Sequence, residues 1–163
     1  MLYYDEEKMS KGEDVMANLA KYINEKAVKC SVYAENWEEA VRAAGALLLE
    51  NGTIKESYIE RCVETVKDEG PYMVLTKGIA LAHTRPGDDV LEEAIGVVSL
   101  KTPVEFGHKE NDPVKLVFLL AALNANSHIN VLMELAQKLS EGDMRERLQH
   151  IDDAKELYEN LVK

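Results

Sequence analysis

The chain has 163 residues, which is long enough for one well-buried core and short for two. Hydrophobic residues make up 46% and charged residues 30%, a balance that excludes a disordered chain and favours one globular domain. The formal net charge of -11 disfavours nucleic-acid binding, which needs a basic face, and disfavours contact with an acidic membrane surface.

No segment of the sequence has the pattern of a membrane span or a leader. No apolar run approaches the roughly 20 residues that a spanning helix needs. The longest, residues 116–123, has the length of a buried strand. The first fifteen residues lack the apolar core of a signal peptide. We therefore expect no membrane insertion and a cytoplasmic location.

The beginning of the chain divides into an extension and the start of a domain. Residues 10–26 have apolar side chains at the spacing of an amphipathic helix, so residues 1–26 are predicted to be an N-terminal helical extension. Residues 27–34 alternate in polarity and are rich in β-formers, which predicts a strand. The main domain is therefore expected to span residues 27–163.

Two helices are predicted after this strand. Asn36, with Glu39 three residues later, has the pattern of a helix N-cap. The apolar face that follows ends at Asn51–Gly52, a common stop signal. A second helix is expected from about residue 54 to residue 69, before Gly70–Pro71.

The middle of the chain has the pattern of a sheet. A turn is expected at Lys77–Gly78, a polar loop at residues 84–88, and a turn region framed by residues 101–103 and 106–108. Several of the strands are apolar on both faces, so they are expected to be covered on both sides. The predicted strands are residues 72–76, 79–82, 94–100 and 115–123.

The last part of the chain is predicted to be helical. Residues 124–126 are expected to form a loop, residues 127–140 a helix, and residues 143–163 one or two charged amphipathic helices. Because strands and helices interleave along the chain, the sequence predicts a single α/β domain. Its expected architecture is a three-layer α/β/α sandwich with a central mixed sheet.

His83 is the first candidate for chemistry. It follows the apolar strand at residues 79–82, and ligands of open α/β sheets bind beyond the carboxyl ends of strands. A neutral imidazole is a nucleophile near pH 7 without help from a strong base. Thr84 and Arg85 come next, and a guanidinium suits phosphate oxygens. From its position alone, a structural role for His83 is favoured.

His128 strengthens the functional interpretation. It lies in the first turn of the helix expected at residues 127–140, directly after a buried strand. A helix N-terminus has free N–H groups and a positive dipole end, both of which favour a bound phosphate. Two histidines at two strand ends could therefore share one phosphoryl group. Taken alone, His128 is better explained as a capping or surface residue.

The remaining polar groups give weaker signals. His108, in a turn, is expected to be solvated, and His150, in a charged helix, is expected at the surface. A cluster of carboxylates after residue 87 is compatible with a metal site, but a solvated face is the better interpretation. The sequence has no metal-ligand spacing and no nucleotide-binding motif, so we expect no metal and no cofactor. The carboxylates are Asp88, Asp89, Glu92 and Glu93.

Two segments read together resemble a known family. Residues 78–86, GIALAHTRP, resemble the active-site motif of the fructose/mannitol (type 2) IIA domains of sugar phosphotransferase systems. Phe106–Gly107, the run NDPVKLV at residues 111–117, and Ser127–His128 are similar to the second half of that family. The resemblance is closest to the ascorbate-type branch and covers about residues 36–148.

The resemblance implies a mechanism and partners. The phosphocarrier protein HPr would phosphorylate His83, and His83 would pass the group to a cysteine of a IIB component. The membrane component IIC would be involved indirectly. His128 would stabilise the phosphoryl group, and Thr84, Arg85 and Ser127 would contact it. Lys67 stands where mannitol-type members carry a functional arginine, and no role is assigned to it.

Two other functions stay open at this point. One is a regulatory IIA-like phosphoprotein of the nitrogen-regulatory type, in which phosphorylation of His83 switches partner binding. The other is a non-catalytic binding module with incidental histidines. Phosphorylation separates a carrier from a binding module, and onward transfer separates transport from regulation.

Overall fold

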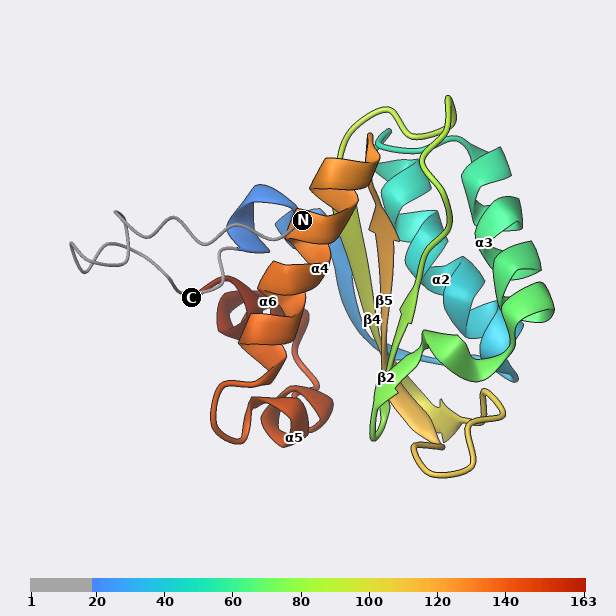
Figure 1. The fold of residues 1–163 in the computed structure, drawn as a ribbon. Coiled ribbons are helices and arrows are strands. Elements are labelled where there is room, and N and C mark those ends of the chain that lie inside the picture. The colour runs from blue at the N-terminus through green and yellow to red at the C-terminus, as the bar shows by residue number, and fades with distance from the viewer. Residues whose placement is uncertain (1–18) are drawn as a thin grey trace.

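The computed structural model describes residues 19–163, which form a mixed five-stranded sheet between two layers of helices (Figure 1). β1 is parallel to β4 and β3 is parallel to β5, whereas β4–β5 and β2–β3 are antiparallel. The three-layer α/β/α prediction is confirmed. In spatial order the strands are β1 (Val28–Val32), β4 (Ala94–Val104), β5 (Val114–Ala121), β3 (Ile79–Ala82) and β2 (Val74–Thr76).

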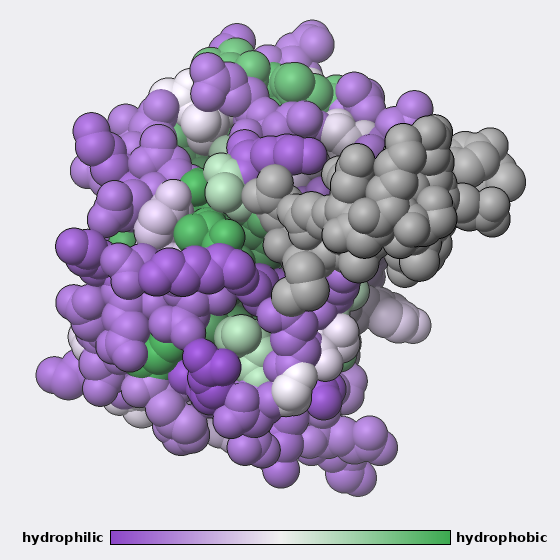
Figure 2. Space-filling model, turned by 90° about the vertical axis from the view of Figure 1, so that its left-hand side faces the viewer, coloured by the Kyte–Doolittle hydropathy of each residue, from purple (hydrophilic) through white to green (hydrophobic). Residues whose placement is uncertain are grey.

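Each face of the sheet has its own helical layer and its own apolar core (Figure 1). Helices α2 (Trp37–Glu50) and α3 (Glu56–Glu69) cover one face. Helices α4 (Ala125–Leu139), α5 (Met144–Gln149) and α6 (Ala154–Val162) cover the other. Where the described residues show in Figure 2, this side of the molecule is mostly hydrophilic, with smaller apolar areas among the polar side chains. None of the described helices is long and apolar enough to cross a membrane.

Local sequence signals fix the layer formed by α2 and α3. The Asn36 side chain accepts a hydrogen bond from the Glu39 N–H at 2.9 Å, so the predicted N-cap of α2 is confirmed. Helix α3 ends at Gly70, whose φ of 76° is readily adopted by glycine. On β4, a Cβ at Gly96 would lie 2.7 Å from the Ala44 carbonyl oxygen. Glycine there lets α2 pack closely on the sheet.

The N-terminal helix expected at residues 10–26 is only partly described. Residues 10–18 lie outside the described part of the chain. The remainder forms two short 3-10 turns, η1 (Leu19–Lys21) and η2 (Glu25–Ala27), and not a continuous helix. Asn24 explains the break, because its backbone is extended and its side chain accepts a hydrogen bond from the Lys26 N–H to start the second turn.

Several element boundaries differ from the prediction by one or more residues, and for three of them the structure shows the reason. The strand expected at residues 72–76 begins as a 3-10 turn, η3 (Pro71–Met73), and becomes β2 only at Val74. Strand β4 continues to Val104 through residues predicted to frame a turn, because Val104 pairs with Val114 of β5. Helix α4 begins at Ala125, two residues before the predicted start, since Asn124 is its cap.

The topology brings two chain segments to one edge of the sheet. Strands β3 and β5 are adjacent and parallel, with Ala82 opposite Leu119. The loop after β3 and the start of α4, which follows β5, therefore lie at the same end of the molecule, at the top of the view (Figure 1). His83 and His128 come from these two segments.

Candidate active site

The rings of His83 and His128 meet at this edge of the sheet. Their centroids are 4.9 Å apart and their planes are inclined by 81°. Both side chains are half-buried, so solvent still reaches them. The two residues are 45 positions apart in the sequence, and the parallel pairing of β3 with β5 brings them together. The structure thus provides two adjacent imidazoles at the surface.

The surroundings of the two rings favour neutral imidazoles. Burial lowers the pKa of His83 below its ordinary value of 6.5, although the Leu81 carbonyl and the charge of Glu69 act in the opposite direction. Burial and the neighbouring His83 ring both lower the pKa of His128. The Nδ1 atom of His83 lies 3.4 Å from the Leu81 carbonyl oxygen. A proton on Nδ1 would be held by this carbonyl, which leaves the Nε2 lone pair available as a nucleophile.

A pocket of about 430 Å³ surrounds the two rings. Its lining contains a cation, two carboxylates, two hydroxyls and a few apolar side chains, so it suits a small polar or charged group more than an apolar ligand. The residues that line it are Thr65, Asp68, Glu69, His83, Thr84, Arg85, Pro86, Ala125, His128 and Ile129.

The N-terminus of α4 contributes to this pocket. Ala125 and His128 line it, and the first hydrogen bond of the helix runs from the His128 N–H to the Asn124 carbonyl. The positive end of the helix dipole therefore lies beside the rings. Ser127 completes a capping box with Asn124 and is not among the lining residues. Of the five predicted site residues, four line the pocket and Ser127 supports it through the cap.

Tyr58 connects the two strand ends that carry the site. It is fully buried, and its hydroxyl donates a hydrogen bond of 2.6 Å to the Leu120 carbonyl on β5. The same oxygen accepts from the Thr84 N–H at 3.4 Å, just after β3. Burial raises the pKa of this phenol, so the hydroxyl stays protonated. Thr84 also shares a hydrogen bond of 2.6 Å with Thr65 on α3.

The two basic residues named from the sequence are placed differently. Arg85 is exposed and lines the pocket. Lys67 does not line it, and its ammonium lies 3.6 Å from Glu38 and 3.7 Å from Glu64. Position 67 therefore takes part in the charged surface of α2 and α3 and is not part of the pocket lining.

One site feature was missed from the sequence. Asp89, predicted to belong to a solvated acidic face, is 8% exposed and forms an ion pair with Arg61 of α3 at 2.6 Å. No pattern of spacing links residues 28 positions apart, so only the fold reveals the pair. Within residues 19–163, no group of three or more His, Cys, Asp or Glu side chains is arranged to hold a metal ion.

Comparison with known proteins identifies the family. Residues 21–163 match the phosphoenolpyruvate-dependent sugar phosphotransferase system EIIA 2 family. The chain belongs to this family. It is thus a IIA component of a sugar phosphotransferase system, and its class of activity is phosphoryl transfer.

Relatives of this IIA chain cover most of its length. The ascorbate-specific EIIA component of Shigella flexneri is 33% identical over 124 residues, which are 76% of this chain and 80% of that protein. The mannitol-specific cryptic enzyme IIA of Escherichia coli has a TM-score of 0.80 at 29% identity, over 89% of this chain and 98% of that one. The IIA chain in a complex of mannitol enzyme IIA with phosphorylated enzyme IIB, also from E. coli, has a TM-score of 0.74 at 28% identity, over 85% and 97%.

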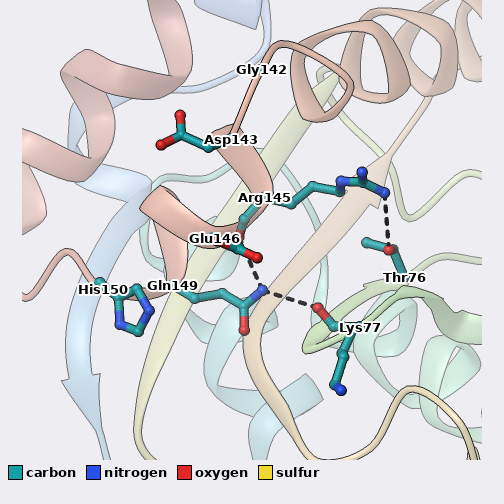
Figure 3. Close-up of a pocket in the computed structure, with 8 residues that line it drawn as sticks. All are labelled: Thr76, Lys77, Gly142, Asp143, Arg145, Glu146, Gln149 and His150. Carbon is teal, nitrogen blue, oxygen red and sulfur yellow. Dashed lines mark hydrogen bonds between the residues drawn. The ribbon is translucent and has the colours of Figure 1, made fainter.

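A second hollow, of about 690 Å³, lies at the other end of β3 in this IIA domain (Figure 3). Side chains of both charges line it, and neither His83 nor His128 does. Gln149 donates to the Lys77 carbonyl at 3.0 Å, and Arg145 reaches Thr76 at 3.4 Å (Figure 3). These bonds connect α5 to the end of β2 and the turn before β3, so Arg145 and Gln149 have a structural role here.

The other two histidines are not part of the pocket around the rings. His150 is exposed at the end of α5, as predicted. His108 was predicted to be solvated but is half-buried, and its Nδ1 accepts a hydrogen bond from the Asn111 N–H at 3.1 Å. That bond closes the turn before β5, which explains why the side chain is held against the protein.

Proposed function

We propose that His83 is the residue of this IIA component that accepts and donates the phosphoryl group. The observation that carries the proposal is that the centroids of the His83 and His128 rings lie 4.9 Å apart, in an open pocket at a helix N-terminus. The nucleophile is the His83 Nε2 lone pair, since the Nδ1 edge faces the Leu81 carbonyl. As the new P–N bond forms, the bond between phosphorus and the donor breaks.

His128 and Arg85 stabilise the phosphoryl group in this proposal. Phosphoryl transfer depends on in-line positioning and on stabilising charge over the phosphoryl oxygens. The His128 ring donates one hydrogen bond, and the Arg85 guanidinium supplies a planar pair of donors. The dipole of α4 adds positive potential at the same place.

Thr84 and Ser127 have supporting parts in the same proposal. Thr84 contacts the phosphoryl group through its hydroxyl, which also bonds Thr65 at 2.6 Å. Ser127 acts through the capping box, by keeping the first turn of α4 and hence the His128 ring in place.

The proposed phosphoryl donor is HPr and the proposed acceptor is a cysteine of a IIB component. The similarity to a IIA chain solved in complex with phosphorylated IIB supports the second partner. Asp68 and Glu69 at the pocket would form ion pairs with a basic partner surface and so favour docking. The membrane component IIC is engaged through IIB, and the reaction takes place in the cytoplasm.

Ascorbate or a pentitol-type sugar is the proposed transported substrate. The relatives named ascorbate-specific are up to 33% identical to this chain, which supports that assignment. Uptake of labelled ascorbate and of labelled pentitols, in cells with and without this chain and its membrane partners, distinguishes the two sugars.

A reconstitution assay tests the carrier function. The chain is incubated with labelled phosphoenolpyruvate, enzyme I and HPr, and acid-labile phosphate is expected on the chain. Addition of the IIB component should then remove the label from the chain. A chain that takes no label contradicts the carrier function, and a label that IIB does not remove favours the regulatory alternative.

The pKa directions of the two histidines predict how phosphorylation depends on pH. An imidazolium cannot attack phosphorus, and burial lowers the pKa of His83 below 6.5. As the pH is lowered, the rate of phosphorylation should therefore stay at its neutral-pH value below pH 6.5 and fall only in more acidic buffer. Ring 15N chemical shifts measured by NMR give the midpoint of His83 without interference from enzyme I or HPr. A midpoint at or above 6.5 would contradict this prediction.

A further inference from the structure

The loop from Thr84 to Val90 carries part of the proposed phosphoryl pocket and is held by few backbone bonds. Thr84, Arg85 and Pro86 line the pocket. At the far end of the loop, Val90 forms an isolated bridge with Ile54, and the Asp89 carbonyl accepts from the Lys55 N–H at 2.8 Å. Between these ends the loop needs another attachment if Arg85 is to keep a fixed position.

One guanidinium supplies that attachment. Arg61 donates from Nε and Nη2 to the two carboxylate oxygens of Asp89, at 2.9 and 2.6 Å. Its Nη1 donates to the Arg85 carbonyl oxygen at 2.9 Å. Ser57 adds a hydrogen bond of 3.0 Å to the Asp89 carboxylate. A single side chain of α3 therefore fixes the loop at two residues four positions apart.

The guanidinium itself is held in place from the side of α3. Its central carbon lies 5.2 Å from the centre of the Tyr58 ring, a cation–π arrangement. On the loop side, a Cβ at Gly87 would come within 2.6 Å of Arg61 Nη2. The loop is thus packed directly against the guanidinium. Bonds from Arg61 also hold the pKa of the Asp89 carboxyl below its ordinary value, so the pair stays charged.

We infer that the Arg61–Asp89 pair is a positioning clamp that sets the place of Arg85 at the phosphoryl pocket. The inference rests on the proposed function of His83. Neither clamp residue lines the pocket, so the clamp acts through the Arg85 backbone. Lysine at position 61 would keep the charge but cannot make the forked bond to Asp89 and reach Arg85 at once.

The test is a double-mutant cycle with Arg61→Lys and Arg85→Ala, measured as the single-turnover rate of phosphoryl transfer from saturating phospho-HPr. Misplacement of a positioning group by about 1 Å can cost up to about a hundredfold in rate, and we expect a loss of about tenfold for Arg61→Lys. In the Arg85→Ala background, Arg61→Lys should have no further effect. Asp89→Asn should behave as Arg61→Lys does.

Arg42→Lys is the matched control. Arg42 makes an equally forked ion pair with Glu60, at 2.6 and 3.0 Å, between α2 and α3, and none of these residues lines the pocket. The transfer rate of Arg42→Lys should equal that of the parent. Two results would overturn the clamp. One is that Arg61→Lys and Asp89→Asn transfer phosphate at the rate of the parent. The other is that, in the double variant, the loss from Arg61→Lys simply adds to the loss from Arg85→Ala.

Hydrogen exchange separates failure of the clamp from failure of the proposed function. If the parent chain takes no phosphate, the proposed function fails, and the clamp is judged by amide exchange alone. Exchange in residues 84–90 should be faster in Arg61→Lys than in the parent, and unchanged there in Arg42→Lys. Equal exchange of this segment in all three proteins would overturn the clamp whatever the transfer assay gives.

Discussion

Replacing His83 with alanine is expected to abolish the acid-labile phosphate that the chain acquires from phosphoenolpyruvate, enzyme I and HPr. The reason is chemical, because the imidazole nitrogen is the atom that bonds to phosphorus and alanine has no nucleophile. His128 lies 4.9 Å away but comes from another element, and we expect it not to take over the reaction. Loss of label is measured after denaturing gel separation at alkaline pH, where phosphohistidine survives.

The control for His83→Ala must show that the fold survives. His83 is half-buried and makes one hydrogen bond of 3.4 Å through its ring, to Leu81. Its removal should therefore cost little stability, and the melting temperature should stay close to that of the parent. His150→Ala, which changes an exposed histidine outside the pocket, should be labelled normally. Unchanged labelling of His83→Ala would place the phosphate elsewhere and end the assignment.

The parts of this fold that were predictable have strong local signals. The N-cap at Asn36 and the apolar run of β5 each act within a few residues, and the structure confirms both. The adjacency of His83 and His128 was expected from a general rule, that parallel strands present their carboxyl ends at one edge. The rule predicted correctly that both histidines lie at the same edge of the sheet. The 4.9 Å between their ring centroids follows from the register of β3 with β5.

The parts that were not predictable depend on contacts between distant residues. Lys101, Thr102 and Pro103 have the composition of a turn, yet β4 continues through them because pairing at Val104 with β5 outweighs local preference. Asp89 was predicted to be solvated, since a sequence does not show that Arg61 lies opposite it. In both places tertiary structure supplied the partner that the local pattern lacked.

Replacing His128 with alanine is expected to slow transfer from phosphorylated His83 to the IIB cysteine while leaving the fold intact. The fold should survive because the cap of α4 is formed by Asn124 and Ser127, and the His128 ring takes no part in it. A hydrogen bond to a charged group contributes about 1.5–3 kcal/mol, so its loss should slow transfer roughly ten- to a hundredfold.

Rapid-quench transfer from the phosphorylated chain to excess IIB measures this effect directly, with His150→Ala as the matched histidine control. His128→Gln is the informative companion, because a glutamine amide still offers a donor to the phosphoryl oxygens. If the ring of His128 acts by hydrogen bonding, glutamine should recover part of the rate that alanine loses. Equal rates in the parent and in His128→Ala would mean that the second imidazole only packs against the first, and that Arg85 and the dipole of α4 suffice to stabilise the phosphoryl group.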